Sequence, residues 1–89
     1  MATFGMVQKE TLIFIVGTYN DGRKPTIIEF YVKNVWKTSD RVIIRLNNGD
    51  KVSFKPNASS AFVKYDNYTK HIFLERAKAE EYFLSLKNE

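Results

Sequence analysis

In this 89-residue chain, the basic residues have the spacing that most favours a chemical role, namely the binding of anions. They recur at alternate positions of segments rich in β-branched residues, so their charges would gather on one face of a sheet. The members of this set are Lys33, Lys37, Arg41, Arg45, Lys51 and Lys55. Lys and Arg in such a cluster can neutralise phosphate or carboxylate groups. The pattern therefore favours an anion-binding surface.

A turn decides whether these charges share a face. Residues 47–50, Asn-Asn-Gly-Asp, form a hairpin signal between two alternating segments. A two-residue loop would set apolar side chains opposite polar ones. A three-residue loop, with Gly49 at positive φ, pairs Ile44 with Val52 and keeps the two faces separate. Because a slip of one residue turns every side chain over, we predict the second register.

This register has a consequence for the charges. It sets Arg45 opposite Lys51, and Arg41 opposite Lys55. Like charges that face each other across a strand pair are destabilising. A surface that keeps such pairs is expected to meet an anion.

The inventory for enzymatic chemistry is poor. His71 is the only histidine, and the alternation of its strand places it beside Phe73, as a structural residue would lie. Ser59 and Ser60 have no evident base or orienting carboxylate, so no triad can be proposed. Cysteine is absent, and His and Asp are too sparse for a metal site. We expect a protein that is not an enzyme and has neither a cofactor nor a metal.

The elements that would position the basic residues form a mainly β protein. Alternation and turn signals predict strands over residues 11–19, 26–37, 41–46, 51–55, 61–65 and 70–74. Residues 75–87 are rich in helix formers and predict a C-terminal helix. We expect one domain over residues 1–89: a strongly curved antiparallel sheet, or an open SH3- or OB-like barrel, of five to six strands with that single helix.

Side-chain parity predicts the faces of this sheet. A three-residue turn with Gly22 at positive φ would pair Phe14 with Ile28 and place both inside. Trp36 and Val42 would share a side, which sets Lys37 beside Arg41 and Lys33 beside Arg45. The outward apolar residues then need a cover, and the helix is expected to provide it. These residues are Ile13, Ile15, Ile27 and Tyr31. The alternative is that the helix lies over the cationic side.

Composition narrows the class of partner. The formal net charge is +4 and the sequence pI is about 9.4, which favours nucleic acid or an acidic protein. The longest wholly apolar run, Leu12–Val16, is far too short to cross a bilayer. The first residues carry no basic segment followed by an apolar one, so we expect a cytoplasmic protein without membrane or small-molecule partners.

Three interpretations of the basic face remain open. The first is contact with single-stranded or structured RNA or DNA, with Tyr31 at the border and Tyr19, Tyr65 and Tyr68 at strand ends where rings can stack on bases. The second is a small inhibitor or adaptor that docks on an acidic protein through Tyr65, Tyr68 and Arg41. The third is plain solvation. SH3- and OB-like barrels often bind through such faces, and the composition resembles that of phage-encoded host-modifying proteins.

Overall fold

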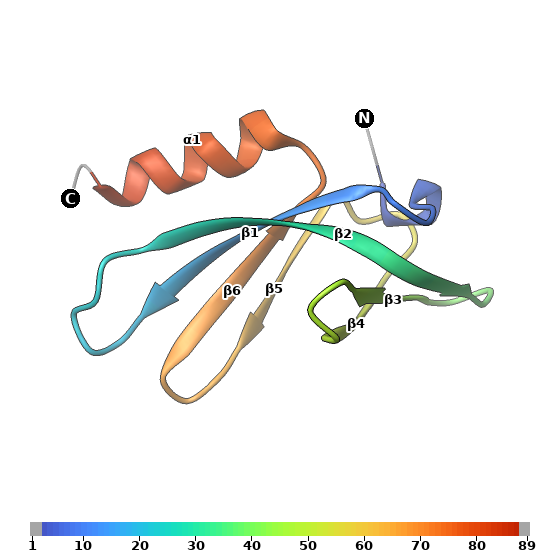
Figure 1. Cartoon of the computed structure of the whole chain (residues 1–89), viewed down its shortest axis with the longest axis horizontal. Helices are drawn as coiled ribbons and strands as arrows, with labels where there is room; N and C mark the ends of the chain where they lie inside the picture. Colours follow the sequence, from blue (N-terminus) through green and yellow to red (C-terminus); the bar gives the residue numbers. More distant parts are fainter. Residues whose placement is uncertain (1–2, 88–89) are drawn as a thin grey trace.

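Six antiparallel strands and one C-terminal helix make up the computed structural model, which describes residues 3–87 (Figure 1). The first and last two residues of the predicted domain lie outside that range. The elements are η1 (Phe4–Met6), β1 (Leu12–Tyr19), β2 (Thr26–Lys37), β3 (Val42–Leu46), β4 (Lys51–Phe54), β5 (Ser60–Lys64), β6 (Tyr68–Phe73) and α1 (Arg76–Lys87). The predicted mainly β class and all seven predicted elements are confirmed, with bounds that agree to within two residues.

The strands form one sheet that curls into a nearly closed barrel. Their order is β4-β3-β2-β1-β6-β5, so β4 and β5 are the two edges. The long strand β2 crosses the whole molecule, and the short β3–β4 hairpin turns away from α1 to the other side (Figure 1). The barrel is therefore open along the line between β4 and β5.

Phe4, near the N-terminus of the chain, packs inside the barrel. Its side chain is fully buried and stacks on Phe54 with ring centroids 3.7 Å apart. Backbone bonds from Phe4 N to Ala58 O (2.9 Å) and from Gly5 N to Pro56 O (2.8 Å) fasten this segment to the loop after β4. The sequence patterns predicted no structure here, because one short turn carries no periodicity.

Strand β1 is buried on both faces and separates two apolar clusters. Ile13 and Ile15 belong to the barrel core, whereas Phe14 and Val16 pack against α1 around the buried Ala79. At the start of the helix Arg76 donates to Glu29 at 2.9 Å and lies over the Phe14 ring. The helix thus covers β1, β2 and β6 on the side away from β3 (Figure 1).

The prediction of which residues the helix covers is therefore only partly correct. Ile27 does pack beneath α1, but Ile13 and Ile15 point into the barrel and Tyr31 is exposed. The cause is the β1–β2 register, in which Phe14 pairs with Glu29 and not with Ile28.

Two features of the chain made that register hard to predict. Residues 12–16 are apolar throughout, so their alternation carries no information about facing. The loop after Tyr19 is also longer than a three-residue turn, because Asn20 bonds to the backbone of Asp66 and Asn67 in the β5–β6 turn. Gly22 does have the predicted positive φ, at 86°.

His71 lies between the sheet and the helix. Its Nε2 is 3.1 Å from the Tyr82 hydroxyl, and its ring packs between those of Phe62 and Tyr82. Phe73 lies on the same face and also contacts Tyr82, as the alternation predicted. Burial lowers the pKa of His71 from its ordinary value of 6.5, because the neighbouring rings replace the water that would solvate its charged form.

The Phe4→Ala variant tests whether the buried Phe4 ring stabilises the barrel. We expect it to lower the free energy of unfolding by about 3–4 kcal/mol, since the change leaves a cavity in the core. The matched control is Met6→Ala, because Met6 is 65% exposed in the same turn and its truncation should cost about 0.5 kcal/mol or less. Urea unfolding measures both, and equal losses for the two variants would contradict the assignment.

The depressed pKa of His71 predicts that stability falls in mild acid. The unfolded chain binds the proton more readily, so stability is complete above the unfolded value of about 6.5 and is lost as pH falls through the lower folded value. NMR titration of the imidazole should give a folded pKa below 6.5. The decline in melting temperature between about pH 7 and 5 should be smaller in His71→Gln. An imidazole that titrates at or above its ordinary value would refute this.

Candidate anion-binding surface

The β3–β4 turn has the predicted bulged form. Gly49 adopts φ of 96°. Its N–H donates to Leu46 O at 2.9 Å, and Leu46 N donates to Asp50 O at 2.8 Å. Ile44 pairs with Val52, and Arg45 pairs with Lys51. The register predicted from the sequence is confirmed, and it places the two cations opposite each other on the outer face.

A β-bulge in β2 changes which side chains join that face. Val32 pairs with Leu46, but the next paired residue is Asn34 with Arg45, so Lys33 is the extra residue of the bulge. Arg45 thus pairs with Asn34, and Lys33, which was predicted to lie beside Arg45, has no pair partner in β3. Beyond the bulge the alternation of β2 is reversed. Val35 turns into the core, and the residue after it turns outward.

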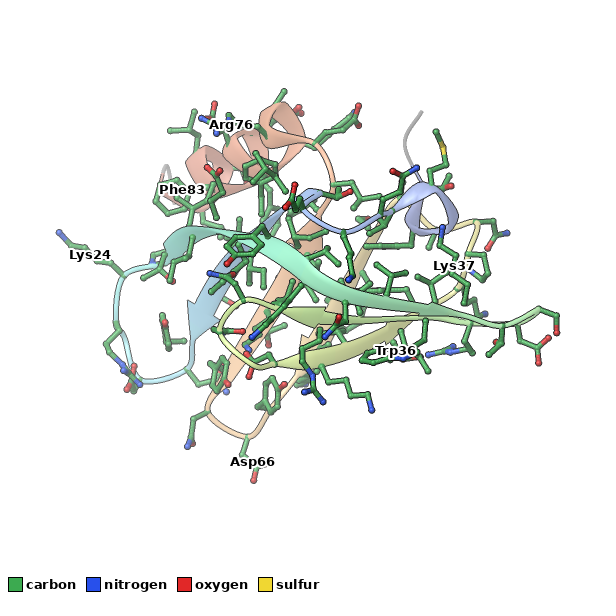
Figure 2. The ribbon with its side chains drawn as sticks, turned by 45° about the vertical axis from the view of Figure 1, so that its right-hand side comes forward. Lys24, Trp36, Lys37, Asp66, Arg76 and Phe83 are labelled. Atoms are coloured by element: carbon green, nitrogen blue, oxygen red, sulfur yellow. The ribbon has the colours of Figure 1, made fainter. Side chains whose placement is uncertain are left out.

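The reversal corrects the prediction for Trp36 and Lys37. Trp36 pairs with Ile43 on the outer face and does not share a side with Val42. Lys37 pairs with Val42, and its Nζ donates to Gly5 O at 2.8 Å, so it fastens the N-terminal turn and does not lie beside Arg41. Figure 2 shows Trp36 and Lys37 on opposite sides of β2.

An exposed indole stands among the remaining cations. Trp36 is 45% exposed, with the Arg45 guanidinium 5.9 Å and the Lys51 ammonium 5.4 Å from its ring. We call this the Trp36 surface, and its residues are Trp36, Arg41, Arg45, Lys51 and Lys55. Ion pairs within residues 3–87 join Asp21 to Arg23, Asp50 to Lys70 and Glu29 to Arg76, so no carboxylate neutralises the four cations of the surface.

Arg41 and Lys55 extend the Trp36 surface toward the open side of the barrel. The Arg41 Nε donates to Ser53 Oγ at 2.9 Å, which holds the guanidinium against β4. Both residues line a groove of about 350 Å³ together with Ala61 and Phe62 of β5. The surface thus continues to the edge of β4.

Tyr31, which was predicted at the border of the basic face, lies beside the β3–β4 turn. It pairs with Leu12 of β1 and is exposed. Its backbone N–H donates to Asn47 Oδ1 at 3.2 Å, and its carbonyl oxygen accepts from Asn47 N at 3.0 Å. Tyr31 therefore flanks the β3–β4 turn.

Three tyrosines gather at the other end of the open line, at the β5–β6 turn. Tyr65 stacks on Tyr68 with centroids 4.6 Å apart, and Tyr68 lies 6.0 Å from Tyr19. Lys70 lies within 6.0 Å of the Tyr65 and Tyr68 rings, and Arg23 lies over Tyr19. The sequence placed each ring at a strand end but could not show that they meet.

A salt bridge joins this end to the β3–β4 turn. Lys70 Nζ donates to Asp50 Oδ2 at 2.9 Å across the open line of the barrel. The bond from Lys70 lowers the pKa of Asp50. Desolvation alone would lower the pKa of Lys70, but the carboxylate outweighs it and the pKa of Lys70 is raised. Lys51, the next residue after Asp50, lines a groove of about 270 Å³ with Tyr65 and Lys70.

Other kinds of site have no support in the described residues. Within residues 3–87, no three His, Asp or Glu side chains come close enough together to hold a metal ion. No helix in the same range has the length and apolar character needed to cross a membrane. Comparison with protein-family models, curated proteins and solved structures finds no match for this chain.

Substitutions of Gly49 test the turn that sets the surface. No atom lies within 4 Å of the Cβ position, so the cost of Gly49→Ala comes from its positive φ alone, and we expect a loss of about 1 kcal/mol of unfolding free energy. Gly49→Asn should lose less, because asparagine tolerates this conformation better. Urea unfolding measures the difference. Equal stability of the alanine variant and the parent would show that the turn makes no such demand.

Proposed function

We propose that this protein is a non-enzymatic module that binds nucleic acid through the Trp36 surface. The observation that supports it most is the pairing of Arg45 with Lys51 around an exposed indole. Two opposed cations repel each other in the free protein, and an anion between them relieves that repulsion. The indole adds a flat ring on which a base can stack.

The mixed chemistry of this surface favours nucleic acid over a simple anion. Phosphate contacts position a strand whatever its sequence, and Arg41, Arg45, Lys51 and Lys55 provide four of them. A free phosphate or sulfate would use the cations but would gain nothing from the indole. A nucleotide uses both groups, because its phosphate and its base are joined by one sugar.

Binding through these cations should depend steeply on salt. With four phosphate contacts, the logarithm of the association constant should fall against the logarithm of salt concentration with a slope of about −3. The double variant Arg45→Glu/Lys51→Glu should weaken binding about tenfold or more at low salt. Fluorescence anisotropy of a labelled oligonucleotide measures both quantities, and a flat salt response would contradict the proposal.

A matched control separates this surface from net charge. Lys24→Glu/Lys78→Glu changes the net charge by the same amount. Lys24 is exposed at the far end of the molecule from Trp36 (Figure 2). Lys78 is exposed on α1. The Lys24→Glu/Lys78→Glu variant should retain most of the affinity of the parent for the oligonucleotide. Circular dichroism and thermal unfolding check that both double variants keep the fold. An equal loss in the two variants would assign the effect to net charge and not to the Trp36 surface.

A second candidate function follows from the two open edges of the sheet. β4 and β5 lack a neighbour on one side, and an extended segment of an acidic protein can pair with such an edge. Tyr65, Tyr68 and Arg41 lie along that line and would be the main contacts. Affinity capture from a nuclease-treated lysate separates the candidates. A stoichiometric protein that survives nuclease, together with no oligonucleotide binding, would favour this one.

A further inference from the structure

We infer that the groove between β4 and β5 is a base-binding subsite that makes the protein selective for single-stranded nucleic acid. This inference rests on the proposed function and extends it beyond the Trp36 surface. The groove has a volume of about 270 Å³. Its walls come from the Lys51 end of β4 on one side and from Val63 and Tyr65 at the end of β5 on the other.

The ring of Tyr65 gives the groove a stacking wall. Tyr68 supports one side of it at 4.6 Å with an interplanar angle of 17°, and Tyr19 supports Tyr68 in turn. Tyr65 nevertheless remains 44% exposed. A ring that is held by packing yet still accessible loses little freedom when a base stacks on it, and such contacts are the usual means of binding unpaired bases.

The charges in the groove favour a base over a phosphate. Lys70 and Asp50 form a salt bridge there at 2.9 Å, so the two charges compensate each other. The Asp50 carboxylate would repel a phosphate, whereas the pair together offers one donor and one acceptor that can meet the edge of a base. The phosphate is therefore expected to remain at the rim, where Lys51 has no carboxylate partner among residues 3–87.

Lys51 connects this subsite to the Trp36 surface. Its ammonium lies 5.4 Å from the indole ring, and the same residue lines the groove beside Tyr65. A phosphate at Lys51 would thus have an aromatic ring on either side, Trp36 outside the barrel and Tyr65 in the groove. One flexible strand held at Lys51 would then place a base on each ring.

Paired bases cannot use the groove. In a duplex each base is stacked on both faces and paired at its edge, so extruding one costs unstacking and unpairing energy. A duplex can still contact the cations of the Trp36 surface through its phosphates. The groove consequently adds affinity for single strands and none for duplexes.

The test compares a labelled oligothymidylate of about twelve nucleotides with a duplex of the same length, at one ionic strength, by fluorescence anisotropy. The parent protein should prefer the single strand. Tyr65→Ala should weaken single-strand binding about 5- to 100-fold and leave duplex binding unchanged. Tyr65→Phe is the matched control, because it keeps the ring and should keep the preference. Thermal unfolding of both variants checks that the β5–β6 turn is intact.

The outcomes separate this inference from the function on which it rests. If the parent binds single strand and duplex equally, or if Tyr65→Ala loses both to the same degree, the base subsite is refuted while the Trp36 surface stands. If the parent binds neither oligonucleotide at low salt, both proposals fail. Binding of an acidic peptide in place of either oligonucleotide would also overturn both, and would assign the groove to a protein strand.

Discussion

Side-chain parity is the constraint on which this molecule depends. Along a strand every second residue faces the same side, so one turn or bulge decides the facing of all residues beyond it. Two backbone features do this here. The turn at Gly49 keeps Arg45 and Lys51 together on the outside, and the bulge at Lys33 brings Trp36 to the same side. Without either one, the indole and the cations would lie on different faces.

The sequence predicted the elements well because alternation and turn residues are local signals. The β3–β4 register could be predicted because Ile44 and Val52 must both be buried, which leaves one acceptable pairing. Facing failed for β1, since its run of apolar residues is buried on both sides. The predicted facing was also wrong for Trp36, although the sequence contains a signal of the bulge. Asn34 interrupts the apolar alternation and Val35 resumes it one residue out of step, as a bulge produces.

The candidate site was predictable only where it is local to one hairpin. The pairing of Arg45 with Lys51 follows from a single turn. The hydrogen bond from Lys37 to Gly5 and the ring contact of Tyr68 with Tyr19 join segments far apart in the chain. Such contacts depend on how the sheet curls, and no periodicity in the sequence records that curvature. The burial of Phe4 inside the barrel was missed because it too depends on this curvature.

The two apolar clusters on either side of β1 also differ in size, and this bears on how the protein opens. Among the residues that the structure describes, the barrel core contains ten buried residues, whereas the cluster beneath α1 contains three, Phe14, Val16 and Ala79. Releasing the helix exposes less apolar surface than unravelling the barrel, so it requires less free energy. Amide protons of α1 can then exchange with solvent through partial opening while those of β1 stay protected. We therefore expect the helix to open as a separate cooperative unit, without loss of the outer face of β2, β3 and β4.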